Sequence, residues 1–151
     1  MPPHSRDIVR RRHLPGRRKV ISHIFLGVND FDRAFEFYSA LMHELGHNLK
    51  FCERDTPWAG WMATDAPRPL FLIGKPYDGN AARGGNGQMV ALLARDRQTV
   101  DQAYARALAN GANCEGAPGL RTQYHPHFYG AYFRDADGNK LCVCCHHPVS
   151  V

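Results

Sequence analysis

The 151-residue sequence lacks any long hydrophobic run. No apolar stretch approaches the roughly 18 residues that a membrane-spanning helix needs, so we expect no membrane segment. The first residues also lack the apolar centre of a secretory signal, and we therefore expect a cytoplasmic protein. The five cysteines are an odd number without such a signal. This combination favours reduced thiols over a disulfide framework.

Most of the chain has no excess of basic residues. The net charge of +5 would by itself suggest a nucleic-acid partner. Residues 1–19, however, hold seven Lys and Arg and one Asp, a local charge of +6, so the other 132 residues sum to −1. A nearly neutral folded part argues against nucleic acid as a partner. We predict that residues 1–19 are a disordered leader, with a phosphate-binding arm or an organellar presequence as alternative functions.

Three common chemical motifs are also absent. The glycines of residues 84–87 are not followed by Lys-Ser/Thr, so they do not form a phosphate loop. An EF-hand calcium loop starting at Asp135 would need glutamate at its twelfth position, where His146 stands. Cys142 and Cys145 spell C-x-x-C in a predicted strand, where residues three apart point to opposite faces. The spacing therefore does not indicate a redox or chelating pair.

The chain does contain one strand-to-helix pattern twice. Alternating apolar residues over 24–28 predict a strand, and Asp30 then precedes an amphipathic helix as a plausible cap. A shift of 66 positions places this pattern on residues 90–108, with Asp96 in the capping position. The pattern indicates an internal duplication. The two helical stripes consist of Ala34, Phe37, Tyr38, Leu41 and Leu45, and of Val100, Ala103, Tyr104, Ala107 and Leu108.

Each copy continues with three further predicted strands, which gives two tandem βαβββ modules and an α+β fold class. The further strands are predicted at 49–53, 58–64 and 70–73 in the first copy, and at 114–121, 128–134 and 141–145 in the second. We divide the chain into the leader 1–19, a domain over 20–147 made of module one (20–75), a glycine-rich linker (76–87) and module two (88–147), and a tail (148–151).

Each module carries one recognisable motif. The first, H-x-x-L-x-V-x-D-x-x-R-A-x-x-F-Y, runs from His23 to Tyr38, and the second, Y-F-x-D-x-D-G-N, runs from Tyr132 to Asn139. Together with the duplication they resemble the vicinal oxygen chelate superfamily, which includes glyoxalase I, bleomycin-resistance proteins and extradiol dioxygenases. The resemblance covers about residues 21–146 and is more specific for fold than for function. It implies that the two modules together form a curled mixed β-sheet cup for a small-molecule ligand, and that the chain forms a homodimer.

The resemblance also implies positions for metal ligands, usually His, His and Glu. His23 matches the first position, but Met89 stands at the second and Cys142 at the position of the glutamate. A thioether and a thiol are poor ligands for Fe(II), Mn(II) or Ni(II), so we expect no such cofactor. Binding of Cu(I) or Zn(II) by this softer set, and simple loss of the metal site, are both open.

Polar residues before the last predicted strands are candidates for catalysis. Arg121, Tyr124 and His125 offer a cation, a phenol and an imidazole, which can recognise an anion or transfer protons. An ordinary surface loop is the alternative for this segment. Core packing is likewise the alternative for the aromatic residues of the predicted pocket. The residues predicted to line that pocket are His23, Trp58, Phe71, Met89, Tyr129 and Cys142.

The function that these observations favour is binding of a small organic molecule in the cup, without the usual divalent metal. Whether the chain is an enzyme is open. The alternative is a metal-dependent lyase, isomerase or dioxygenase with His23 among its ligands, in which His125 or His127 supplies the missing imidazole. The sequence does not identify the ligand.

Overall fold

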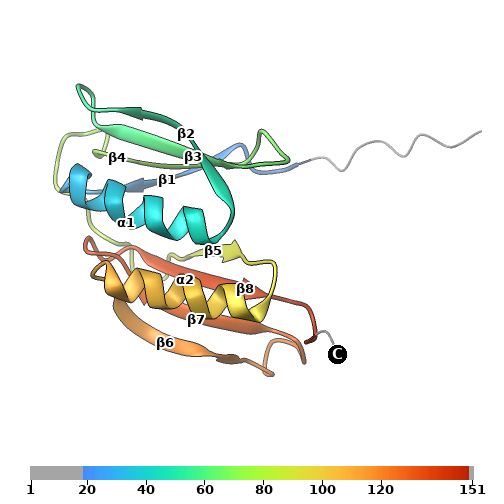
Figure 1. The fold of residues 1–151 in the computed structure, drawn as a ribbon. Coiled ribbons are helices and arrows are strands. Elements are labelled where there is room, and N and C mark those ends of the chain that lie inside the picture. The colour runs from blue at the N-terminus through green and yellow to red at the C-terminus, as the bar shows by residue number, and fades with distance from the viewer. Residues whose placement is uncertain (1–18, 150–151) are drawn as a thin grey trace, which may run out of the picture.

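The structure, a computed structural model, describes residues 19–149 (Figure 1). All of the predicted leader except Lys19 lies outside these residues. No helix in the described part is long and apolar enough to cross a membrane. The elements are β1 (His23–Gly27), α1 (Phe31–Glu44), β2 (His47–Glu53), β3 (Trp58–Ala63) and β4 (Leu70–Gly74), then β5 (Val90–Leu93), α2 (Arg97–Ala109), β6 (Asn113–Leu120), β7 (Tyr129–Arg134) and β8 (Lys140–Cys145).

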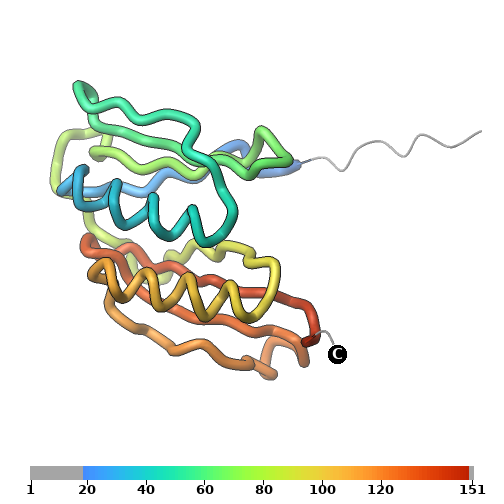
Figure 2. Tube along the Cα trace, in the orientation of Figure 1, coloured from blue at the N-terminus to red at the C-terminus, as the bar shows by residue number. Residues whose placement is uncertain are grey.

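The two modules have the same topology, so the predicted duplication and the α+β fold class are confirmed. Each contains a four-stranded mixed sheet, in the order β1-β4-β3-β2 or β5-β8-β7-β6. The first strand of each module runs parallel to its last strand and the other neighbours are antiparallel. Each helix packs on one face of its own sheet, and α1 and α2 also contact each other between the modules (Figures 1 and 2).

Capping carboxylates mark the start of both helices, and glycines follow their ends. The carboxylates of Asp30 and Asp96 each accept a hydrogen bond from the backbone N–H three residues on, at 3.1 and 2.7 Å. These bonds satisfy N–H groups that have no partner inside the helix. Gly46 and Gly111 follow the helix ends with φ of 75° and 96°, a conformation that favours glycine. Helix α2 ends at Ala109, and Asn110 is its C-cap.

The ends of the elements and of the stripes differ slightly from prediction. Strand β2 begins at His47, two residues early, because His47 still pairs with Ala63 on β3. In α1 the fully buried residue near the end is Met42, whereas Leu45 is the partly buried C-cap. Tyr104 and Leu108 of the second stripe are also only partly buried.

Alternation along the strands gives each sheet a helix side and an open side. On β8, Leu141, Val143 and Cys145 belong to the core under the helices, whereas Cys142 and Cys144 point to the open side. The same parity places Phe133 in the core and Tyr132 on the open side of β7. One hydrophobic core therefore runs under both helices, while the open faces are available for other contacts.

The linker between the modules is more ordered than its composition predicts. Ala82 is buried, and its backbone N–H donates to Asn29 Oδ1 at 2.7 Å while its carbonyl accepts from Asn29 Nδ2 at 3.0 Å. One asparagine thus satisfies both backbone groups of a buried alanine in the linker.

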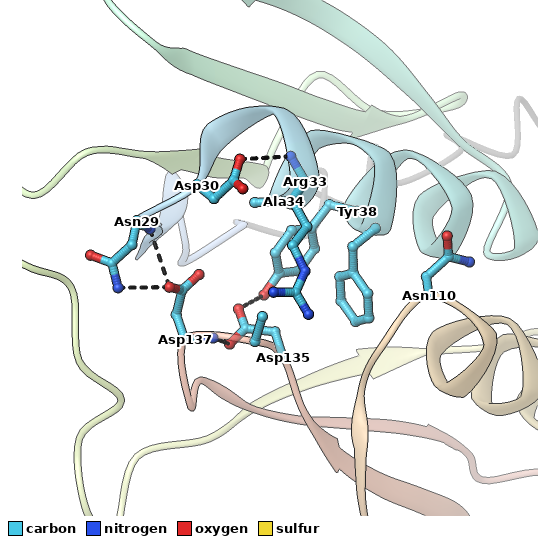
Figure 3. A pocket seen from close by; sticks show the side chains of 10 residues that line it. Asn29, Asp30, Arg33, Ala34, Tyr38, Asn110, Asp135 and Asp137 are labelled. Atoms are coloured by element: carbon cyan, nitrogen blue, oxygen red, sulfur yellow. Dashed lines mark hydrogen bonds between the residues drawn. The ribbon is translucent and has the colours of Figure 1, made fainter.

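A polar cluster joins the two modules, and Figure 3 shows most of it. The hydroxyl of Tyr38 donates to Asp135 Oδ2 at 2.6 Å, and both side chains are almost fully buried. Asn29 Nδ2 donates to Asp137 Oδ1 at 2.7 Å, and Asn139 Nδ2 donates to the carbonyl of Gly27 at 2.9 Å. We call Asn29, Tyr38, Asp135, Asp137 and Asn139 the module clamp. Burial, with the Asp135 carboxylate beside it, raises the pKa of Tyr38 well above its usual value, so its hydroxyl stays a donor.

Removal of the Tyr38 hydroxyl tests the clamp. Tyr38→Phe keeps the ring in the core but takes a donor from the buried Asp135 carboxylate, so the free energy of unfolding should fall by about 1.5–3 kcal/mol. Urea denaturation measures this change. Tyr77→Phe, at a fully exposed tyrosine, is the matched control and should change the free energy by less than about 0.5 kcal/mol. Equal stability of the two variants would contradict a stabilising clamp.

Candidate functional site

A hollow of about 600 Å³ lies on the open side of the module-two sheet. This volume is within the range of about 300–1,000 Å³ that small-molecule sites occupy. Residues of module one do not contribute to its lining, which differs from the cup shared by both modules that the resemblance implies. We call it the module-two hollow. Its apolar and aromatic lining consists of Met89, Ala91, Tyr124, Phe128, Tyr132 and Cys142.

Strand register builds the floor of this hollow. Ala91 on β5 lies opposite Cys142 on β8, and Cys142 lies opposite Tyr132 on β7. Residues paired across neighbouring strands share one face of a sheet, so these three side chains form a row across the floor. Met89 precedes Ala91 by two residues and faces the same space. The predicted pocket residues Met89 and Cys142 are thus brought together.

The polar groups of the hollow can bind a ligand through a neutral donor and cations. Burial, with a further contribution from Cys142, raises the pKa of Tyr132 to about 12, so the phenol keeps its proton at neutral pH. The Arg121 guanidinium and the Lys140 ammonium lie 5.6 and 5.9 Å from the centre of the Tyr132 ring. Glu115 pairs with Lys140 at 3.4 Å, whereas no carboxylate in the described part of the chain pairs with Arg121.

The predicted catalytic candidates separate in space. Tyr124 lines the hollow, and Arg121 lies beside its Tyr132 ring. His125 is not part of the lining, and its Nε2 is 2.7 Å from Nδ1 of His146 instead. No sequence pattern indicated a role for His146, which comes directly after the last strand. Catalytic roles for Arg121, Tyr124 and His125 stay predictions.

The aromatic residues predicted to line the pocket lie elsewhere. Phe71 is in the core, with its ring centre 5.3 Å from that of Tyr38. Tyr129 packs against the core and donates from its hydroxyl to Asp101 of α2 at 2.7 Å. Both face their helices, which agrees with the core-packing alternative. Trp58 lies in module one and does not line the module-two hollow.

The structure does not bring together the three positions that the resemblance assigns to metal ligands. His23 is not among the residues around Met89 and Cys142, and its Nδ1 lies 3.1 Å from the Ser22 hydroxyl. The neighbouring Cys144 thiol, together with burial, raises the pKa of the Cys142 thiol well above its usual value, so the thiol stays protonated. Within residues 19–149 no group of three or more His, Cys, Asp and Glu side chains is placed to hold a metal. The absence of a metal cofactor stays a prediction.

A second, smaller cavity of about 160 Å³ adjoins the module clamp (Figure 3). Its polar groups are mostly occupied by one another: Asp137 accepts from both the backbone and the side chain of Asn29, and Asp135 accepts from Tyr38. Burial raises the pKa of Asp137. Because these groups already have protein partners, we assign this cavity to the junction between modules.

Comparisons with known proteins agree with this architecture. A family model described as "Glyoxalase/Bleomycin resistance protein/Dioxygenase superfamily" matches residues 20–143. A glyoxalase/bleomycin resistance protein from Albidiferax ferrireducens T118 is 33% identical, with a TM-score of 0.73 over 85% of this chain and 98% of that one. The comparison with curated proteins gives no match.

Two more distant structures show the same fold. A glyoxalase/bleomycin resistance protein/dioxygenase family enzyme from Burkholderia phytofirmans PsJN is 16% identical, with a TM-score of 0.64 over 83% of this chain and 98% of that one. A glyoxalase-related enzyme from Fulvimarina pelagi is 18% identical, with a TM-score of 0.63 over 85% of this chain and 88% of that one.

The raised pKa of Tyr132 predicts how the free energy of unfolding depends on pH in alkaline solution. Since the folded chain holds this proton more tightly than the unfolded chain, the stabilisation is complete below about pH 10 and is lost as the pH rises towards 12. Tyr132→Phe removes this dependence. Between pH 10 and 12, the free energy of unfolding should fall less steeply for Tyr132→Phe than for the wild type. The two slopes should differ by up to about 1.4 kcal/mol per pH unit. Parallel slopes in urea denaturation would show that Tyr132 titrates normally.

Proposed function

Because the chain belongs to the glyoxalase/bleomycin resistance protein/dioxygenase superfamily, we propose that it binds a small organic molecule in the module-two hollow, without a divalent metal. The observation that carries this proposal is the hollow itself, with its volume of about 600 Å³ and its aromatic walls. A concave, mainly apolar surface with a few polar groups is the usual form of a small-molecule site.

The lining favours a flat ligand with an acidic or carbonyl group. Tyr124, Phe128 and Tyr132 present aromatic surfaces, and Met89 adds a flexible apolar side chain. The protonated phenol of Tyr132 can donate a hydrogen bond to a ligand oxygen. The guanidinium of Arg121, close to the same ring, can attract a negative charge.

The metal-dependent alternative requires a second imidazole ligand besides His23. Met89 and Cys142, at the other two ligand positions, do not supply it. For His125 to provide it, a ring nitrogen must be free. Its Nε2 is engaged with His146 at 2.7 Å, and its Nδ1 accepts the backbone N–H of His127 at 3.1 Å. These contacts favour the metal-independent function. Metal loading, described below, tests the alternative of a lyase, isomerase or dioxygenase with His23 as a metal ligand.

We also propose that the chain forms a homodimer in the cytoplasm. The free outer strands β1 and β5 carry Phe25 and Leu93, whose side chains are 45% and 66% exposed, so a second copy could cover apolar surface there. All five cysteines are free, which suits a reducing compartment. Light scattering should give twice the mass of one chain, and a monomer at micromolar concentration would contradict the dimer.

A fluorescent aromatic anion tests the hollow as a binding site. We expect 8-anilinonaphthalene-1-sulfonate to bind with one-to-one stoichiometry, because its flat rings and sulfonate match the aromatic walls and the cation. Tyr132→Leu should weaken this binding about tenfold, since it removes the phenol and the ring beside Arg121. Tyr77→Leu, at an exposed tyrosine, is the control and should leave the affinity unchanged. Equal affinities for the two variants would contradict binding in the hollow.

Metal loading separates the metal-free proposal from its alternative. After incubation with Mn²⁺, Fe²⁺, Ni²⁺ or Zn²⁺ and desalting, elemental analysis should find less than about 0.1 equivalent of each, because the site offers a thioether and a protonated thiol. His43→Ala, at an exposed histidine of α1, is the control for His23→Ala. Stoichiometric metal that persists in His43→Ala and disappears in His23→Ala would overturn the metal-free function.

A further inference from the structure

A chain of hydrogen bonds leads from the backbone to the buried Cys144 thiol. The backbone N–H of His127 donates to Nδ1 of His125 at 3.1 Å. Nε2 of His125 lies 2.7 Å from Nδ1 of His146, and Nε2 of His146 lies 3.8 Å from Sγ of Cys144. None of these contacts belongs to the lining of the module-two hollow.

The backbone N–H of His127 sets the direction of the hydrogen bonds that follow it in this series. Because His125 Nδ1 accepts a hydrogen bond, the neutral ring carries its proton on Nε2 and donates it to His146. Nδ1 of His146 is then an acceptor, so its own proton sits on Nε2 and points to the sulfur of Cys144. The imidazole therefore acts as a donor to Cys144, which favours the thiolate over the thiol.

A second thiol lies beside Cys144 on the same strand. Cys142 and Cys144 are two residues apart on β8 and share its open side. The neighbouring Cys142 thiol, with His146 as a further cause, lowers the pKa of Cys144 below its usual value. The contact with His146 Nε2 at 3.8 Å acts in the same direction as the hydrogen-bond series described above.

Cys144 is so buried that only small reagents can reach its thiol. Its side chain is only 3% exposed. Gly130 lies opposite Cys144 on β7, and an added Cβ there would come within 2.9 Å of the Phe128 ring and 3.3 Å of Cys144 Cβ. The ring of Phe128 therefore packs beside the thiol, with its centre 5.2 Å from that of His146.

We propose that Cys144 is a hydroperoxide-reactive thiol, held in its reactive form by the His125–His146 pair. The thiolate attacks one oxygen of the hydroperoxide, so that an S–O bond forms as the O–O bond breaks. Sulfur is oxidised by two electrons to sulfenic acid, the peroxide is reduced by two, and the leaving hydroxide or alkoxide takes a proton from water.

The test follows oxidation of the reduced full-length chain by hydrogen peroxide at pH 7, with a cyclic 1,3-dione present to trap sulfenic acid. Mass spectrometry of the tryptic peptide 141–151 assigns the label, because fragmentation distinguishes Cys142, Cys144 and Cys145. We expect Cys144 to react about tenfold faster than the exposed Cys114. Cys144→Ser should abolish the label at this position.

Two alanine variants of adjacent, exposed histidines isolate the role of the hydrogen-bond chain. His146→Ala removes the donor to Cys144 and should slow the oxidation of Cys144 about tenfold. His147→Ala should leave the rate unchanged. The proposal is overturned if Cys144 reacts no faster than Cys114, or if the two variants behave alike. The oxidation of Cys144 is measured without dye, and neither histidine lines the hollow, so failure of this proposal is distinct from failure of ligand binding.

Discussion

The hydrogen bond between Tyr38 and Asp135 is the constraint on which the arrangement of the two modules depends. It links the middle of α1 in module one to the hairpin between β7 and β8 in module two, and both partners are almost fully buried. Backbone N–H groups of Asp137 and Asn139 also donate to Asp135, at 2.9 Å each. A buried carboxylate with this many donors is costly to separate from them. The clamp therefore holds the hairpin, and with it one end of the β7–β8 pair that carries the site.

The two sequence motifs that suggested the fold are the two halves of this clamp. The first motif supplies Tyr38, and the second supplies Asp135 and Asn139. Several polar residues of the motifs are used in joining the modules, so the motifs are more informative about fold than about function. The proposed function depends on residues of the hollow, such as Tyr132 at the start of the second motif and Cys142 after its end.

Much of the fold could be predicted because its signals are local. Helix caps at Asp30 and Asp96, the glycines after each helix and the period of each strand depend on residues close in sequence. The site was less predictable because it depends on strand parity and register. All five residues of β4 are buried, so no polar–apolar alternation showed that Phe71 faces the helix.

Long-range contacts account for the remaining errors and omissions. His146 meets His125 only because β7 and β8 pair in one register, which local sequence does not report. The expected grouping of His23 with Met89 and Cys142 assumed a single cup between the modules. The hollow instead lies on module two alone, so the residue at the position of the first metal ligand is outside it.

We propose that ligands bind on the open side of the module-two sheet and not at the junction between modules. Amide chemical-shift mapping by NMR, during titration with a flat aromatic carboxylate, distinguishes these two places. We expect saturable shifts at Ala91, Tyr132 and Cys142, on three adjacent strands. Shifts confined to Asn29, Arg33 and Asp137, around the smaller cavity, would contradict it.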